Sequence, residues 1–299
     1  MIDNHFDLLT IAYISYLKND YTYLEKIKYY FNKNNVIGVI ANLYFMSIEE
    51  MREELDINYY NPFVSVVNMF KISKNILEEY LPNTNILYSI EGCDYVNIED
   101  LEKLYSLGLR SIILVWNNKN KYGSGNRSDI GLTKLGKEFI KKAIDLNIGI
   151  DLSHANEKTF NDIIDIIKSY EKKVICYASH SNSRKLCDNK RNLTDEQLYK
   201  IKEVNGLVGV VSYKKFIGNN TYLDHIIHIE SIVGIDNVIL SSDDMSFYNY
   251  LGHYNNNQLF DYSNICKNIL RILLLQYDLE KCYNILRRNS EKFFNELRR

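Results

Sequence analysis

The sequence predicts an α/β protein built as a (β/α)8 TIM barrel, and three observations lead to this fold class. Short apolar, β-branched runs alternate with longer amphipathic stretches along the whole chain. The strand-then-helix unit repeats every roughly 25–45 residues, a spacing typical of parallel βαβ units. Eight units follow one another without a break in composition. We therefore expect one closed barrel domain over residues 1–299, a length usual for this fold.

Each strand is predicted from a short apolar run that is rich in β-branched residues. In chain order the eight predicted strands are Ile2–Leu8, Val36–Phe45, Ile86–Ile90, Ser111–Val115, Gly149–Leu152, Val174–Ala178, Leu207–Ser212 and Asn237–Ser241.

Amphipathic periodicity predicts helices between these strands. The predicted helices include Asn97–Ser106, Lys134–Leu146, Lys158–Glu171, Thr194–Glu203 and Tyr222–Val233. Thr133 and Thr194 stand where an N-cap is expected, and Asp195 and Glu196 place negative charge in a first turn. A helical tail, Tyr262–Leu297, is expected to close the barrel from outside.

An open, doubly wound sheet is the competing architecture. Such sheets usually carry a glycine-rich phosphate-binding loop after a strand. No G-x-G-x-x-G or G-x-x-x-x-G-K-[ST] motif follows any predicted strand. The sequence therefore favours the closed barrel.

Composition and charge narrow the class of protein. The chain is 46% hydrophobic and 25% charged, and its net charge of −2 gives no electrostatic footprint for nucleic acid or an anionic membrane. Its first residues lack a leader pattern, and no run approaches the roughly 18 apolar residues of a membrane span. Five cysteines without a C-x-x-C pair predict neither a disulfide framework nor a thiolate zinc site. We expect a cytoplasmic protein with no nucleic-acid or membrane partner.

Six ionisable side chains gather at the C-terminal ends of five predicted strands. They are His5, Asp7, Glu91, His154, His180 and Asp243. In a barrel these strand ends converge on one mouth, where active sites are built. The sequence therefore predicts that the six groups share one site.

The H-x-D pair at the first strand indicates metal binding. Residues i and i+2 of a strand point to the same face, so His5 and Asp7 can reach one ion. Imidazole and carboxylate together suit zinc or a similar divalent metal. Glu91 can bridge two ions, and His154 and His180 can complete the second site. Two ions sharing a hydroxide would supply a nucleophile at neutral pH and polarise a scissile carbonyl.

Each of these residues has a structural explanation when it is taken alone. An isolated H-x-D pair is usually structural, a histidine at a strand end is often buried and hydrogen-bonded, and a terminal Glu often caps a helix. Their joint occurrence at five strand ends favours a metal site. His225 and His228 lie on a predicted helix and are expected to pack or cap, and His253 is expected at the surface.

The same residues lie in stretches that resemble the membrane dipeptidase (renal dipeptidase) family of zinc metallopeptidases, in a bacterial cytoplasmic form. The similar stretches follow family order across nearly the whole chain, and the block from Gly131 to Leu198 is the most specific. They are Ile2-Asp-Asn-His-Phe-Asp-Leu, Ile90-Glu-Gly, Leu107-Gly-Leu-Arg-Ser-Ile-Ile-Leu, Gly131-Leu-Thr-Lys-Leu-Gly, Ile150-Asp-Leu-Ser-His, Ala178-Ser-His-Ser-Asn-Ser-Arg, Lys190-Arg-Asn-Leu-Thr-Asp-Glu-Gln-Leu, Asp224-His-Ile and Val233-Gly-Ile-Asp-Asn-Val-Ile-Leu-Ser-Ser-Asp.

The resemblance implies a binuclear zinc site that cleaves dipeptides, often with a D-residue at the C-terminal position, and a homodimer. It assigns His5 and Asp7 to one zinc, Glu91 to the bridge, and His154 and His180 to the other zinc. Other divalent first-row metals could occupy the same ligands.

The resemblance also implies roles around the metals. Asp243 would be the acid/base that handles a proton, and Arg191 would hold the substrate carboxylate with its planar fork. Trp116 stands where the animal enzymes have a substrate-contacting histidine, and its indole N–H can donate a hydrogen bond. Asp244-Met-Ser replaces the family's usual aromatic, Asp and Gly.

Three functions remain open from the sequence. The first is a metal-dependent dipeptidase. The second is an amidase or peptidase for one specialised small molecule such as a Cys-Gly conjugate, which Trp116 and the loop after Asp243 motivate. The third is a metal-binding barrel without catalysis, which the intact ligand set and Asp243 disfavour.

Overall fold

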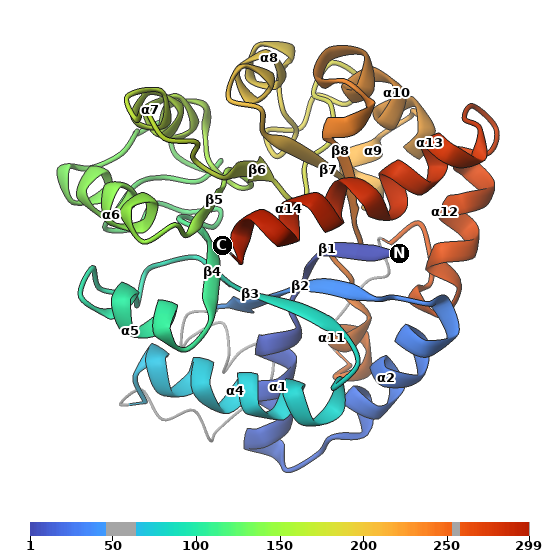
Figure 1. The fold of residues 1–299 in the computed structure, drawn as a ribbon, viewed down its shortest axis with the longest axis horizontal. Helices are drawn as coiled ribbons and strands as arrows, with labels where there is room; N and C mark the ends of the chain where they lie inside the picture. Colours follow the sequence, from blue (N-terminus) through green and yellow to red (C-terminus); the bar gives the residue numbers. More distant parts are fainter. Residues whose placement is uncertain (46–63, 253–257, 299) are drawn as a thin grey trace.

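Eight parallel strands form a barrel in the computed structural model, which describes residues 1–45, 64–252 and 258–298 (Figure 1). His253 lies outside the described residues. Strands that follow one another in the chain are hydrogen-bonded neighbours throughout, and every pairing is parallel. The strands are β1 (Ile2–Phe6), β2 (Gly38–Tyr44), β3 (Asn85–Glu91), β4 (Leu109–Ile113), β5 (Gly149–Asp151), β6 (Cys176–Ala178), β7 (Leu207–Val211) and β8 (Val238–Ser241).

The seam between β8 and β1 closes the barrel through side chains. Asn4 on β1 donates from Nδ2 to the Leu240 carbonyl on β8 at 2.7 Å. Asp3 accepts from the backbone N–H of Ser242 at 2.8 Å, just beyond β8. The first and last strands are therefore neighbours, and the predicted (β/α)8 barrel is confirmed.

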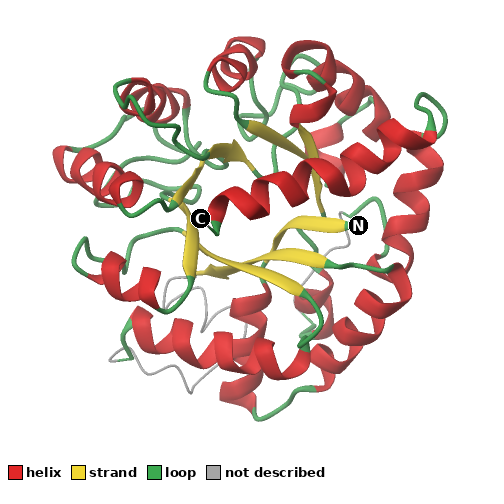
Figure 2. Ribbon diagram, viewed as in Figure 1, coloured by secondary structure: helices red, strands yellow, loops and turns green. Residues whose placement is uncertain are grey.

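Helices surround the strands, as Figure 2 shows. They are α1 (Leu8–Lys18) and α2 (Thr22–Asn34) after β1, α4 (Val66–Tyr80) after β2, α5 (Asp100–Ser106) after β3, α6 (Lys134–Asp145) after β4, α7 (Glu157–Lys168) after β5, α8 (Asp195–Glu203) after β6, α9 (Lys214–Ile217), α10 (Tyr222–Val233) and the short η1 (Ile235–Asn237) after β7, and α11 (Ser246–Tyr250) after β8. Among the described residues, no helix is both long enough and apolar enough to cross a membrane.

The predicted strands are all present, with ends displaced by at most two residues. The predicted helix starts at Thr133 and Thr194 are also confirmed. Thr133 accepts from the Gly136 N–H at 3.0 Å. Thr194 and Gln197 form a reciprocal capping box, which satisfies two backbone donors at the start of α8.

The C-terminal tail differs from the single outer helix that the sequence suggested. It contains η2 (Tyr262–Asn264), α12 (Ile265–Leu273), α13 (Leu279–Tyr283), the π-helical turn η3 (Asn284–Arg288) and α14 (Asn289–Leu297). A turn separates α12 from α13 because Asp278 caps a new helix by accepting from the Lys281 N–H. In Figure 1, α14 crosses the barrel axis in front of the strands, so the tail closes the N-terminal mouth of the barrel.

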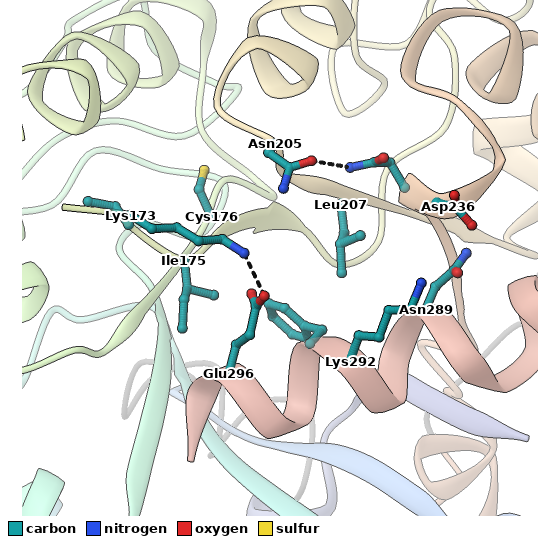
Figure 3. Close-up of a pocket in the computed structure, with 12 residues that line it drawn as sticks. Lys173, Ile175, Cys176, Asn205, Leu207, Asp236, Asn289, Lys292 and Glu296 are labelled. Carbon is teal, nitrogen blue, oxygen red and sulfur yellow. Dashed lines mark hydrogen bonds and ion pairs between the residues drawn. The ribbon is translucent and has the colours of Figure 1, made fainter. Parts of the chain in front are cut away.

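Apolar side chains of α14 fill the N-terminal mouth of the barrel. Phe293, Phe294 and Leu297 pack with four residues of the strands, namely Ile2, Ile40, Leu87 and Tyr177. Beside this cluster, a cavity of about 210 Å³ lies between α14 and the starts of β6 and β7 (Figure 3). The Lys173–Glu296 ion pair lies at its edge, with nitrogen and oxygen 2.5 Å apart. The cavity contains none of the predicted site residues.

Candidate metal centre

The six predicted ionisable groups meet at the C-terminal mouth of the barrel. His5 is at the centre of one half, and its Nε2 lies 3.1 Å from Glu91 Oε2. The same nitrogen lies 3.8 Å from Asp7 Oδ1 and 3.7 Å from Asp243 Oδ1. His5 lies in β1 and Asp7 lies one residue beyond its end, and both side chains face the same half of the cluster.

Glu91 also faces the second half of the cluster. Its other oxygen, Oε1, lies 2.8 Å from His154 Nε2 and 3.9 Å from His180 Nε2. The two histidine Nε2 atoms are themselves 2.9 Å apart. One oxygen of Glu91 thus faces each half, which is the placement that a bridging carboxylate needs.

His154 and Asp243 lie in turns beyond their strands, where the sequence had placed them at strand ends. β5 ends at Asp151 and β8 ends at Ser241. His154 has φ = 70° and Asp243 has φ = 46°, both in the left-handed region. That conformation costs roughly 1–2 kcal/mol for a residue with a Cβ. Tight turns of this kind aim both side chains into the mouth, and such strain is common at functional sites.

Asp7 precedes α1 but does not cap it. Its side chain makes no hydrogen bond to the first turn of that helix. Among the described residues, the buried Asp7 Oδ1 has no hydrogen-bond partner. A buried polar atom without a partner is costly, so this oxygen fits a cation placed beside it.

The Nδ1 atoms of the three histidines face away from the centre and toward polar partners. His154 Nδ1 lies 3.1 Å from Asn117 Oδ1. His180 Nδ1 lies 2.7 Å from Ser179 Oγ. His5 Nδ1 lies 2.9 Å from Asn42 Nδ2 and 3.3 Å from Ser179 Oγ. Sequence reasoning missed these three partners, although Asn42 interrupts an apolar strand and Ser179 directly precedes His180.

The hydrogen bonding of His154 indicates that a positive charge fits beside its Nε2 atom. Asn117 Oδ1 also accepts from Asn126 at 3.1 Å, so this oxygen is the acceptor for His154 Nδ1–H. A neutral imidazole that donates from Nδ1 has a lone pair on Nε2. That lone pair faces the carboxylate oxygen of Glu91 at 2.8 Å. Two acceptors this close need a positive ion or a proton between them.

Charge is distributed unevenly over the cluster. Burial opposes protonation of His5, but the Glu91, Asp243 and Asp7 carboxylates raise its pKa to about 10. Burial lowers the pKa of His154 to about 4, and the Arg191 guanidinium adds to this shift. Without metal, one half therefore holds an imidazolium among carboxylates, and the other holds neutral imidazoles.

The pKa of the Glu91 carboxyl lies below its usual range. Burial raises the pKa of this carboxyl, but the His5 and His154 imidazoles lower it by more. Burial also lowers the pKa of His180, and the charges of His5 and Arg191 act in the same direction. Glu91 is therefore an anion and His180 is neutral near pH 7, the forms in which each can bind a metal.

Asp243 and Arg191 flank the cluster with opposite charges. Burial raises the pKa of Asp243, and its side chain is about 20% exposed. Burial lowers the pKa of Arg191 to about 10, although the Asp243, Glu91 and Asp151 carboxylates oppose that shift. Arg191 is buried, and its guanidinium lies 5.4 Å from the centre of the Phe216 ring. Both residues therefore lie close enough to Glu91 to interact with its charge.

Trp116 forms an aromatic wall beside His154. Its ring centre is 6.0 Å from that of His154 and 5.1 Å from that of Tyr44. The Arg127 guanidinium lies 6.0 Å from the Trp116 ring. The structure thus brings Trp116 to the predicted site.

Asp244, which follows Asp243, contacts the start of α11. Asp244 is buried and accepts from the backbone N–H and the hydroxyl of Ser246. Ser246 Oγ in turn contacts the Tyr23 hydroxyl on α2. Asp244 therefore anchors the start of α11 against α2.

His225 and His228 lie apart from the cluster, as predicted. His225 accepts from the Ser183 N–H at 3.1 Å and contacts the Ile217 carbonyl through Nε2 at 3.1 Å. His228 pairs with Asp195 on α8 at 2.7 Å. Both residues therefore serve packing between α10 and its neighbours.

Solved structures with this fold include two metallo peptidases. Dipeptidase AC, of peptidase family M19, has a TM-score of 0.77 at 20% identity, and the alignment covers 99% of this chain and 97% of that one. A metallo peptidase from Rhodobacter sphaeroides, solved with a phosphinate mimic of the dipeptide L-Ala-D-Ala, has a TM-score of 0.75 at 20% identity and covers 99% and 98%. At 20% identity, these two similarities support the fold alone.

Sequence relatives match shorter parts of the chain. An uncharacterized protein of Acinetobacter calcoaceticus is 39% identical over 135 residues, which are 42% of this chain and 41% of the relative. An uncharacterized dipeptidase of Schizosaccharomyces pombe is 33% identical over 174 residues, which are 53% of this chain and 41% of the relative. The chain thus spans about two fifths of the length of these curated relatives.

The pattern of one family covers most of the chain. It is described as membrane dipeptidase, peptidase family M19, and it matches residues 58–298. His5 and Asp7 lie before the matched span, and the other four residues of the cluster lie within it. The chain belongs to the membrane dipeptidase family, peptidase family M19.

Proposed function

We propose that the protein is a metal-dependent dipeptidase that hydrolyses the peptide bond of dipeptides, including those with a D-residue at the C-terminal position. One observation carries the proposal: three imidazoles present their Nε2 atoms to the two oxygens of one buried carboxylate, Glu91. Family membership and the dipeptide mimic bound to the Rhodobacter sphaeroides neighbour support the substrate class.

Two divalent cations, which we propose to be zinc, fit this donor set. His5 and Asp7 would hold one ion, His154 and His180 the other, and Glu91 both. The buried Asp7 Oδ1 and the facing acceptors of His154 and Glu91 support this assignment. When bound, such ions supply Lewis acidity toward a carbonyl and a nucleophilic water at neutral pH.

Asp243 is the proposed proton carrier. Its carboxylate lies beside His5, within reach of solvent, and burial raises its pKa toward the range useful for acid–base work. In our proposal it accepts a proton from the attacking water and returns that proton to the leaving amine. The backbone of Asp243 holds this position, because its N–H donates to the His5 carbonyl at 3.1 Å.

Arg191 is the proposed anchor for the C-terminal carboxylate of the substrate. Its pKa of about 10 keeps the guanidinium charged at neutral pH. Planar, two-pronged hydrogen bonding suits recognition of a carboxylate. Trp116 is the proposed wall that orients the peptide group, with its indole N–H as donor.

The test is hydrolysis of a mixed panel of L-L and L-D dipeptides with zinc supplied. Chelator-sensitive release of amino acids from several members is expected. Glu91→Gln should lose the activity and retain the fold, whereas the surface control Glu203→Gln, which removes a partner of Lys168, should retain both. Full activity in Glu91→Gln or in the presence of chelator would refute the proposal.

A second candidate is a peptidase or amidase for one specialised small molecule. The contacts of Trp116 with Tyr44 and Arg127 beside His154 favour it, because such a wall would set selectivity in this proposal. The same panel separates the two candidates. Turnover of many dipeptides excludes the specialist, and turnover of a single conjugate excludes the general dipeptidase.

A further inference from the structure

We propose that Ser179 is a positioning residue for both halves of the metal centre: its hydroxyl contacts the Nδ1 atoms of His5 and His180 together. This inference rests on the proposed metal binding, and it concerns residues outside the ligand set. It assigns a role to Ser179 and Asp151 that the sequence did not suggest.

The position of the hydroxyl carries the first step. Ser179 Oγ lies 2.7 Å from His180 Nδ1 and 3.3 Å from His5 Nδ1. These histidines belong to different halves of the centre, and their ring centres are only 3.8 Å apart. An imidazole that offers Nε2 to a metal carries its proton on Nδ1. A hydroxyl oxygen has two acceptor lone pairs, so Ser179 can accept from both rings at once. Asn42 Nδ2 lies 2.9 Å from the same His5 Nδ1, and Asn42 Oδ1 is buried without a partner among the described residues. With its amide turned over, Asn42 is a second acceptor for the His5 proton.

Asp151 holds the backbone that carries the Ser179 hydroxyl. This buried carboxylate accepts from the backbone N–H groups of Ser179 and Ser153, each at 3.0 Å. The Ser179 hydroxyl can donate to Ser153 Oγ, 3.4 Å away, which leaves its oxygen lone pairs for the histidines.

Asp151 could instead be considered a metal ligand, because it forms a compact group with His5 and His180. However, its Oδ1 already accepts two backbone N–H groups. The Nδ1 atoms of both histidines face Ser179, and their Nε2 atoms face Glu91. Asp151 therefore acts on the histidines through the backbone of Ser179.

The backbone at Ser179 is held from the neighbouring strands. A Cβ at Gly209 on β7 would lie 1.7 Å from the Ser179 carbonyl oxygen, so only glycine permits this approach. Ser241 on β8 donates its hydroxyl to the same carbonyl. Ser179 thus lies on a rigid support from which one oxygen can set two rings.

His154 is positioned independently, and this difference supplies a control. Its Nδ1 contacts Asn117, which comes from the loop after β4. Loss of Ser179 should therefore weaken both metal sites, and loss of Asn117 should weaken one. Ser181 provides the matched serine control, because its hydroxyl is buried and makes no hydrogen bond within the part of the chain that the structure describes.

The experiment titrates zinc into the metal-free proteins against a competing chelator. Ser179→Ala should lower the zinc affinity of the His180 site by about 10- to 100-fold, the usual effect of losing such a supporting contact. The affinity of the His5 site should fall by less, because His5 Nδ1 keeps its contact with Asn42. Asn117→Ala should lower one affinity only, and Ser181→Ala should leave both within about twofold of the unmodified chain. Two full-affinity zinc sites in Ser179→Ala would overturn the inference.

A spectroscopic measurement on the unmodified protein remains informative if Ser179→Ala does not fold. In the zinc-loaded chain, proton NMR should show two slowly exchanging imidazole Nδ1–H signals, assigned to His5 and His180. Rapid exchange of either signal would overturn the shared contact. Zinc binding without dipeptide hydrolysis would refute the proposed function alone, whereas absence of zinc binding to the unmodified chain would refute both.

Discussion

Zinc affinity should rise steeply with pH, because His5 must release a proton before its Nε2 can bind a metal. The surrounding carboxylates raise the pKa of His5 to about 10, so this imidazole is protonated near pH 7 in the metal-free protein. His154, with a pKa of about 4, and His180, whose pKa is lowered, are already neutral there. One histidine of the three therefore links metal binding to pH.

The magnitude follows from this linkage. Below the pKa of His5, each displaced proton changes the apparent affinity about tenfold per pH unit. Between pH 6 and pH 8 the zinc affinity should therefore increase at least about 100-fold, or about 2.7 kcal/mol. The pKa values of Asp7 and Asp243 are also raised, so any proton they release makes the dependence steeper.

Chelator competition at pH 6, 7 and 8, corrected for protonation of the chelator, measures this slope. His5→Asn and His180→Asn form a matched pair, since each removes one imidazole ligand. The pH dependence should persist in His180→Asn and flatten in His5→Asn. A zinc affinity independent of pH in the unmodified protein, or equal slopes in the two variants, would refute the reasoning.

Three further predictions concern the proton carrier, the substrate anchor and the packing of α14 in the N-terminal mouth of the barrel. Asp243→Asn should lower kcat by about 10²- to 10⁴-fold at unchanged zinc content, as measured by steady-state kinetics and metal analysis. An unchanged kcat would contradict its role as proton carrier. Arg191→Met should raise KM for dipeptides about 30-fold or more but leave dipeptide amides unaffected, and an equal loss for both substrates would contradict its role. Phe294→Ala, at a fully buried position of α14, should cost about 3–5 kcal/mol in urea unfolding. Leu275→Ala, at a position 77% exposed, should stay within about 0.5 kcal/mol, and similar values for the two variants would count against packing by α14.

Local patterns in the sequence predicted the strands and the inward-facing groups well. The period of a strand is enough to place His5 and Asp7 on one face, and strand order is enough to bring Glu91 and the other histidines to the same mouth. These inferences need no knowledge of the distances across the barrel. They depend only on where each strand ends.

The supporting contacts could not be predicted in the same way. Asn42 reaches His5 across 37 residues of chain, and Ser179 reaches it across 174. Such partners depend on how strands shift against one another when the barrel closes, and a single sequence does not specify that register. The left-handed turns at His154 and Asp243 are likewise imposed by tertiary contacts, because neither residue type requires them.

The course of the tail was misjudged for a related reason. Its apolar residues repeat with helical period whether they pack on the barrel wall or in its mouth. The cap at Asp278 interrupts this helical pattern, and the chain then turns toward the N-terminal mouth of the barrel. A cap of this kind is visible in the sequence, but the direction of the helix that follows it is not.

The position of α14 across the floor of the barrel has a consequence during synthesis on the ribosome. The lower ends of β1, β2, β3 and β6 bury their apolar side chains against a helix that is translated after all eight strands. Until residues 289–297 have left the exit tunnel, Ile2, Ile40 and Leu87 lack their cover, and that surface can attract other nascent chains or chaperones. The helix α14, translated after all eight strands, therefore completes the burial of the N-terminal mouth of the barrel.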